Sequence, residues 1–528
     1  MGNTNYESLT KSLKDIVSPD RLTTDQEERA YLSQDAFWDD AVADFVVRPE
    51  DKRQISAVLA AASAAGFAIV PRGGGMSYTR GYVPNRKNTV IVDCRDLNRI
   101  VEINEEDMYI TAEAGCTWMQ IYETLKEKGL RTPYFGPMSG MFATVGGALS
   151  QNSMLYGSAE YGTVAESVLG LEVALSDGRM VSTGSRANRG GKPFFRHYGP
   201  DLTGVFLSDT GALGLKVEAT IRLIRAPRFT EYASFSFCDF YDLAKAQSEI
   251  GRAGIAAEAY GLDPYLNGKR TMVKDMKSGL EAVGKVVQAQ GSLGKGIKEA
   301  AKMAIAGATG FADDVDYSLH LTFDSNNAQD AAWRLAEARR IVATTKSGKE
   351  MEPIIPKVVR AQPFKHVGEF IVGHEGERWI PIHACLPASK LIAVYEATMA
   401  YFESKKEVLK KFNISTSHLT GSSGTDIVFE PAFYYPDALK EFHYRNLEPE
   451  DAEKYKGLPA TGATEEVIKM LGDLAQIFME HGAVNQQLGK FYPYKDALNG
   501  DTWAVLEGVK HVVDPQGLMN PGSLGLGK

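Results

Sequence analysis

The chain has 528 residues, a formal net charge of −9 and 44% hydrophobic residues. This length allows about two to four domains, and the composition excludes a disordered, collagen-like or disulfide-rich chain. The acidic balance argues against a nucleic-acid partner, because phosphate binding needs a basic face. No stretch is apolar for long enough to predict a membrane span, and the N-terminus has no signal-peptide pattern. We therefore expect a cytoplasmic protein.

The first predicted elements are short and follow one another closely. A polar lead-in covers residues 1–40. It is followed by a strand at 45–47, a helix that starts near Pro49, and a strand at 68–71 that ends in glycines. An apolar run rich in β-branched residues at 88–97 predicts a buried strand.

Residues 131–162 are dense in Gly, Pro, Ser, Asn and Tyr, which predicts a long functional loop. Two strands should then flank a tight hairpin at Asp177 and Gly178. The composition of the sequence and the pattern of predicted elements change near residue 226. Beyond it we expect the following elements: a Lys-, Ala- and Gly-rich helical stretch near 269–310, helices near 329–343, 389–412 and 464–482, strands near 378–386 and 424–435, and a tail helix stopped by Pro515.

Four motifs have a composition that suits a bound cofactor. The first, at 71–78, reads PRGGGMSY directly after a strand, where consecutive glycines let backbone N–H groups turn toward one anion such as a pyrophosphate. It is neither a Rossmann fingerprint nor a Walker A loop. The others lie at 143–162, 209–214 and 514–522. Each alone is compatible with an ordinary turn, but their order and spacing together are not.

The chain resembles the vanillyl-alcohol oxidase / para-cresol methylhydroxylase flavoproteins. It is most similar to the branch with D-lactate dehydrogenases, glycolate oxidase subunits and alkyl-dihydroxyacetone-phosphate synthase. The matching stretches are PRGGGMSYTRG, ATVGGALSQNSMLYGSAEYGTVAESVLGLEVALSDGR, GPDLTGVFLSDTGALG and DPQGLMNPG. The resemblance implies an α+β fold with a split FAD-binding domain, at 41–225 and 501–528, and a mixed α/β cap at 226–500 that holds the substrate.

The resemblance also implies which residues hold FAD. They are Pro71, Arg72, Gly73, Gly74, Gly75, Met76, Ser77, Thr144, Gly146, Gly147, Asn152, Gly157, Tyr161, Gly162, Gly211, Gly214 and Asn520. Relatives with a histidine-linked flavin carry His directly after the glycines. Here that residue is Met76, so we expect non-covalent FAD. We expect no metal site, because the hydroxy-acid branch's His-x-Gly-Asp-Gly-Asn-x-His run is absent after His418.

The expected function is FAD-dependent transfer of a hydride from an alcohol or a para-substituted phenol to flavin N5. The candidates for substrate contact, base or anion stabiliser are His383, His418, Tyr494 and Lys495. Tyr494 and Lys495 occupy the place of a Tyr-Arg pair that holds the phenolate in the phenol-oxidising branch, with Tyr78 or Tyr82 as partner. For each of these residues an ordinary structural role stays open.

Three alternatives remain at this point. One is a D-2-hydroxy-acid dehydrogenase of the lactate or glycolate type, and another is flavin-dependent, non-redox ether synthesis. The third is a flavin-binding scaffold that has lost catalysis. The expected partners are a small-molecule substrate and an electron acceptor, which is oxygen, a cytochrome or a quinone. A homodimer is common in the family.

Overall fold

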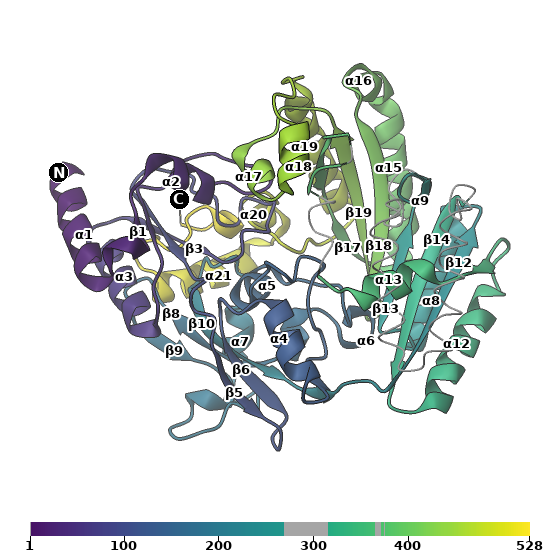
Figure 1. Cartoon of the computed structure of the whole chain (residues 1–528), viewed down its shortest axis with the longest axis horizontal. Helices are drawn as coiled ribbons and strands as arrows, with labels where there is room; N and C mark the ends of the chain where they lie inside the picture. Colours follow the sequence, from purple (N-terminus) through teal and green to yellow (C-terminus); the bar gives the residue numbers. More distant parts are fainter. Residues whose placement is uncertain (1, 269–314, 365–370, 374, 528) are drawn as a thin grey trace.

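The computed structural model describes residues 2–268, 315–364, 371–373 and 375–527. The helical stretch predicted near 269–310 lies outside these residues. Within the described part, no helix combines the length and the apolar composition needed to cross a lipid bilayer. The described elements form two sheets near the N-terminus, a small two-stranded sheet beside them, and one large sheet later in the chain (Figure 1). The domain boundaries at 225 and 500 stay a prediction.

The first sheet has four strands in the order β1-β2-β4-β3. Its strands are β1 (Leu22–Thr23), β2 (Phe45–Val47), β3 (Ala68–Arg72) and β4 (Thr89–Asp93), flanked by α1 (Gly2–Ile16), α2 (Gln26–Leu32) and α3 (Lys52–Ala64). β2, β4 and β3 are parallel. The helix predicted from Pro49 begins at Lys52, because the Asp51 carboxylate accepts the Gln54 N–H at 2.9 Å and caps it there.

The second sheet is antiparallel, in the order β5-β6-β10-β8-β9. Its strands are β5 (Ile100–Asn104), β6 (Tyr109–Glu113), β8 (Val168–Ala174), β9 (Met180–Ser182) and β10 (Leu215–Arg222). The hairpin predicted at Asp177 and Gly178 is confirmed, and Gly178 has a φ of +85°. The helices and minor strands nearby are α4 (Trp118–Lys126), α5 (Val145–Gln151), α6 (Ser158–Tyr161), α7 (Leu202–Val205), β7 (Leu130–Arg131) and β11 (Ile224–Arg225). The segment at 131–162, predicted as a loop, therefore contains two helices.

The largest sheet, here called the cap sheet, has the strand order β15-β12-β14-β13-β18-β19-β16, and β17 also pairs with β19. Its strands are β12 (Phe229–Phe237), β13 (Glu258–Leu262), β14 (Tyr317–Ser325), β15 (Lys349–Met351), β16 (Arg378–Pro381), β17 (Ala384–Pro387), β18 (Ser415–Ser423) and β19 (Asp426–Tyr435). All its pairings are antiparallel. The helices that follow or cover it are α8 (Phe240–Ala253), α9 (Pro264–Gly268), α12 (Ala328–Val342), α13 (Ile354–Ala361), α15 (Leu391–Ser404), α16 (Lys406–Lys411), α17 (Glu441–Arg445), α18 (Pro449–Lys454) and α19 (Ala463–Glu480).

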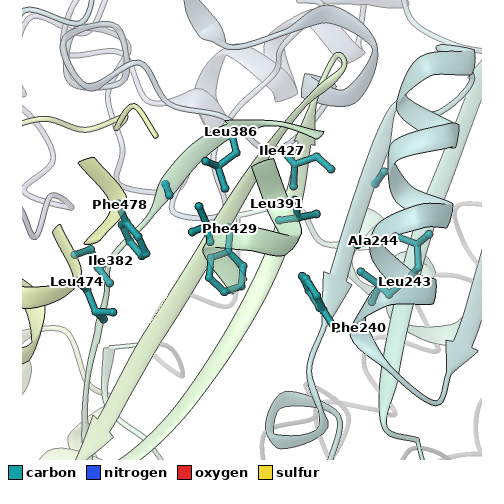
Figure 2. Packing of buried hydrophobic residues seen from close by; sticks show 14 of the residues in the cluster. Phe240, Leu243, Ala244, Ile382, Leu386, Leu391, Ile427, Phe429, Leu474 and Phe478 are labelled. Atoms are coloured by element: carbon teal, nitrogen blue, oxygen red, sulfur yellow. The ribbon is translucent and has the colours of Figure 1, made fainter. Parts of the chain in front are cut away.

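One face of the cap sheet forms the largest hydrophobic core of the described chain. Strand residues such as Ile427 and Phe429 point toward Phe240 and Leu243 of α8 and toward Leu391 of α15 (Figure 2). Because neighbouring strand residues point to opposite faces, alternate residues of the same strands face away from this core. That second face is the one turned toward the cofactor cavity described below.

Two predicted elements are divided in the structure. The strand expected at 378–386 becomes β16 and β17, because Pro431 of β19 has no N–H and the His383 N–H donates to the Tyr492 hydroxyl at 3.0 Å. The helix expected at 389–412 becomes α15 and α16.

The chain's last segment returns to its first sheet. After α20 (Tyr494–Ala497) and α21 (Gly500–Val513), the Ile69 N–H of β3 donates to the Leu518 carbonyl at 2.8 Å. In return, the Asn520 N–H donates to the Ile69 carbonyl at 2.7 Å. Figure 1 shows this yellow segment beside the purple N-terminal strands. The tail therefore extends the edge of the sheet that carries the first glycine loop.

Candidate active site

A cavity of about 410 Å³ lies between the glycine-rich loops and the open face of the cap sheet. One side of the cavity, here called the cofactor end, is lined by the loop after β3, the start of α5 and the segment at 210–214. The opposite side, here called the cap end, is lined by residues of β13, β18 and β19. The predicted site residues that line it are Pro71, Arg72, Gly73, Gly74, Gly75, Met76, Ser77, Thr144, Gly146, Gly147, Gly211, Gly214 and His383.

The cofactor end is built by two loops that approach too closely for side chains. A Cβ atom on Gly74 would overlap the Phe142 carbonyl oxygen, and one on Gly73 would overlap the Thr144 hydroxyl. Gly75 has a φ of +75°, in the region that favours glycine. The Thr144 hydroxyl accepts the Gly147 N–H at 3.3 Å and so caps α5. The backbone itself therefore forms this surface.

Buried polar groups at this end still have hydrogen-bonding capacity. Arg72 is 3% exposed, its Nη1 lies 3.7 Å from the Asp93 carboxylate, and its Nε has no partner in the described chain. The Gln151 Oε1 also lacks a partner there. Buried polar groups normally have hydrogen-bond partners, so we expect these two to find partners on a molecule bound in the site. A glycine-lined surface with a buried guanidinium and an unused amide oxygen fits FAD, whose pyrophosphate is an anion and whose ring has polar edges.

The segment before β10 is fixed by a buried ion pair. Asp209 accepts the Gly211 N–H at 2.9 Å and the Leu213 N–H at 3.2 Å, and it also pairs with Lys216. Lys216 lines the cavity but is bound to this carboxylate. The Gly-rich turn is therefore held in place beside the cofactor end.

Five residues predicted to hold FAD do not line the cavity: Asn152, Gly157, Tyr161, Gly162 and Asn520. Three of them, Asn152, Gly157 and Asn520, instead fix the local backbone around the loops. Asn152 ends α5 in a left-handed conformation (φ +52°), and the Gly157 N–H donates to the Glu258 carboxylate at 3.0 Å. Asn520 donates to the Gly81 and Thr210 carbonyls at 2.7 and 2.6 Å.

The pairing register of the cap strands determines which residues lie side by side at the cap end. Leu262, Leu419 and Glu430 stand opposite one another on β13, β18 and β19. Pairing of Ala432 with Pro381 and of Phe429 with Ala384 places His383 opposite Glu430. Directly opposed residues share a face, with Cβ atoms roughly 4.5–5.5 Å apart. Glu430 and His383 are therefore neighbours on the cavity face.

A parallel row lies two residues along these strands. It consists of Tyr260, Gly421 and Val428, which all line the cavity. The Tyr260 hydroxyl is buried and has no partner in the described chain. Apart from that hydroxyl, this row presents an apolar floor.

His383 is firmly held. Its Nε2 lies 2.6 Å from the Gln486 carbonyl oxygen, so this nitrogen donates, and its Nδ1 lies 3.4 Å from the Tyr492 hydroxyl. Burial lowers the pKa of His383 to about 4. The imidazole is neutral, and its donor is already used by the backbone.

His418 does not reach the cavity. Its strand neighbours Ser417 and Leu419 line the cavity, so the alternation of the strand turns His418 to the core face. There its ring lies 5.5 Å from that of Phe240, and its Nδ1 is 3.4 Å from the Asp263 carboxylate. Burial lowers the pKa of His418 to about 3, which is typical of a structural histidine.

Tyr494 and Lys495 also lie away from the cavity. Tyr494 packs against the hydrophobic core beside the second sheet. The Lys495 Nζ lies 4.5 Å from the centre of the Trp503 ring. The structure therefore does not place this pair, which the resemblance implied would hold a phenolate, in the lining of the cavity.

Glu430 lies at the cap end but is not among the catalytic residues predicted from the sequence. It lines the cavity, and burial raises its pKa to about 7. Tyr78 and Tyr492 face it, and burial together with the Glu430 charge raises the pKa of Tyr78. Strand alternation was the available signal, but it needed the cross-strand register to show which face Glu430 occupies. Gln151, Lys216 and Tyr260 carry no motif and were missed.

Comparison with known protein families gives two matches. Residues 43–184 match the FAD binding domain, and residues 463–524 match the C-terminal domain of FAD linked oxidases. The chain is 31% identical over 252 residues to the mitochondrial D-lactate dehydrogenase (cytochrome) of Arabidopsis thaliana, covering 47% of this chain and 42% of that protein. It is 30% identical over 224 residues to glycolate oxidase subunit GlcD of Bacillus subtilis, covering 42% of this chain and 46% of that protein. The chain thus spans less than half the length of these curated relatives.

One relative is similar over the whole length. The chain is 25% identical over 540 residues to the FAD-linked oxidoreductase YgcU of Escherichia coli K12, with 98% of each chain covered. Among solved structures, p-cresol methylhydroxylase superposes with a TM-score of 0.71 at 16% identity, over 99% of this chain and 98% of that one. The 4-ethylphenol oxidase of Gulosibacter chungangensis gives 0.72 at 14% identity, over 100% and 98%. These structures share the fold, an FAD-binding domain with a cap. The chain therefore contains the FAD binding domain and the C-terminal domain of FAD linked oxidases, and FAD is its cofactor.

Proposed function

We propose that this protein oxidises an uncharged alcohol or para-substituted phenol in the cavity between the glycine loops and the cap sheet. FAD, when bound, supplies the acceptor for the hydride. The observation that supports this substrate class most is the charge of the cap end. Glu430 is its carboxylate, and no Lys or Arg among the described residues lines the cavity from the cap sheet.

The cations that do line the cavity in the described chain are Arg72 and Lys216. Both belong to the cofactor end, beside the carboxylates of Asp93 and Asp209. A substrate carboxylate placed near Glu430 would meet a like charge in a poorly solvated space, which is unfavourable. A neutral hydroxyl meets no such penalty.

The remaining walls suit an apolar substrate. Leu262, Leu419, Ile355, Val359 and Trp379 line the cap end. Such walls exclude water and hold a flat or bulky carbon skeleton against the ring of the cofactor.

D-2-hydroxy-acid oxidation is the second candidate, because the curated relatives include D-lactate dehydrogenases. That reaction needs a cation for the substrate carboxylate, and the described cap end lacks one. Flavin-dependent ether synthesis has weaker support: alkyldihydroxyacetonephosphate synthase shares the fold, with a TM-score of 0.65 at 16% identity.

The test is anaerobic bleaching of the visible flavin absorbance by a panel of substrates. The panel contains para-substituted phenols, benzylic and aliphatic alcohols, and D- and L-2-hydroxy acids. We expect phenols or alcohols to reduce the flavin, and the rate of reoxidation by air then separates an oxidase from a dehydrogenase. Reduction by a D-2-hydroxy acid alone would refute the proposal. Because Met76 offers no nucleophile, acid precipitation of the protein should release the flavin.

A further inference from the structure

The open face of the cap sheet presents the half-buried carboxylate of Glu430, which makes no side-chain hydrogen bond or ion pair within the described chain. Among the described residues, none donates a hydrogen bond to the Glu430 side chain, and it faces the cavity between Leu419 and His383. A carboxylate kept only for folding normally has donors or a cation. An unpaired one beside a substrate space is placed to accept a proton from what enters that space.

We propose that Glu430 is the catalytic residue that accepts the hydroxyl proton of the substrate. The inference rests on the proposed function and assigns the base for it. FAD, when bound, would accept as hydride the two electrons of the substrate C–H bond that breaks. The O–H bond breaks at the same carbon centre, its proton passes to a Glu430 oxygen, and the C–O bond becomes C=O. For a phenol, the same carboxylate would take the phenolic proton while the hydride leaves the benzylic carbon of the para substituent, so that the ring becomes a quinone methide.

The groups around Glu430 do not compete for this role. Burial raises the pKa values of Tyr78 and Tyr492, so both hydroxyls stay protonated and neither takes the proton in place of Glu430. His383 is neutral, and its Nε2 donates to the Gln486 carbonyl. No described cation lies beside Glu430, so its own pKa is set by burial and rises to about 7. A base with a pKa near the working pH is the most effective.

The test compares Glu430→Gln with the wild-type holoenzyme, and Asp426→Asn serves as matched control. Asp426 is an exposed carboxylate at the start of the same strand. We expect the wild-type rate of anaerobic flavin reduction to rise with pH through about 7, because the ionised form accepts the proton. Glu430→Gln should reduce this rate on the order of 10²- to 10⁴-fold and abolish the pH step. Asp426→Asn should retain both.

Thermal unfolding gives a readout that does not depend on turnover. The folded pKa of Glu430 lies above the ordinary carboxyl value, so the fold loses stability as pH rises from that ordinary value to about 7, and this loss is complete at higher pH. Glu430→Gln should therefore have a higher Tm than wild type at alkaline pH, and the difference should vanish in acid. A lower Tm at alkaline pH would show a structural carboxylate and overturn the proposal.

The outcomes also separate this proposal from the proposed function. If alcohols or phenols reduce the wild type and Glu430→Gln is reduced equally fast with the same pH profile, the assignment of the base is wrong and the substrate class stands. If no alcohol or phenol reduces the wild type, the proposed function and this inference both fail. Retained flavin absorbance confirms that the variant is folded.

Discussion

At the scale of single residues, the first glycine motif is explained by the approach of two backbones. Gly74→Ala would press a methyl group into the Phe142 carbonyl oxygen, which belongs to the backbone and cannot rotate away. Overpacking of this kind costs about 1–3 kcal/mol, so we expect lower stability and lower FAD content. Urea unfolding and the flavin-to-protein absorbance ratio measure the two effects.

A matched control for this substitution exists in α19. A Cβ on Gly472 meets no atom within 4 Å, and alanine favours a helix over glycine by about 1 kcal/mol. Gly472→Ala should therefore leave FAD content unchanged and should not destabilise the protein. Equal FAD content in both variants would contradict the close approach of the loops.

Residue types alone predicted the cofactor end better than the cap end. Glycines that lack room for a Cβ are visible in a sequence, and most of the predicted ones line the cavity. A histidine in a strand is ambiguous, because a shift of one residue moves it to the other face. That is why His418 was proposed for the site while Glu430, on the cavity face, was not among the predicted catalytic residues.

At the scale of elements, α13 and the cap strands are joined to the FAD-binding part by buried charges. Arg360 of α13 pairs with Glu258 of β13 and Asp324 of β14. Arg131 of β7 lies 2.7 Å from Asp324. Burial alone would raise the pKa of Asp324, but Arg360 and Arg131 lower it below its usual range. The two arginines thus keep Asp324 ionised where these elements meet.

Arg360→Ala should destabilise the protein by about 3–5 kcal/mol at neutral pH, because it removes a shared cation from two buried carboxylates. The stabilisation from Asp324 is present above its ordinary pKa and is lost as pH falls through its lowered folded pKa. The difference between variant and wild type should therefore shrink in acid. Urea unfolding at several pH values measures it.

Arg340→Ala is the control, since Arg340 forms an exposed pair with Glu337 within α12. We expect no measurable change there, because solvent screens such pairs. A loss in Arg340→Ala equal to that in Arg360→Ala would mean that burial of the network is not the cause.

At the scale of the whole molecule, the resemblance that the four motifs carry implied a split FAD-binding fold with a cap, and the comparisons confirm this fold. The sequence did not predict how the cap sheet is ordered. Neighbours such as β13 and β18 are separated by more than 150 residues of chain, and no local pattern encodes that pairing. The cap end of the site depends on this register, so it could not be read from the sequence.

The tail shows how distant parts of the chain close the cofactor end. The buried Asn520 donates to the carbonyls of Gly81 and Thr210, which both line the cavity. Asn520→Asp removes the side-chain amide that donates both hydrogen bonds. The new carboxylate then lies beside the two carbonyl oxygens, which lose their donor. A buried acceptor left without a donor costs roughly 1–3 kcal/mol. We expect lower stability and weaker FAD retention, measured by urea unfolding and flavin content after gel filtration.

Asn499→Asp is the control, because Asn499 caps α21 by accepting the Thr502 N–H at 2.9 Å and aspartate accepts equally well. If both variants retained FAD equally, the donor role of Asn520 would be wrong.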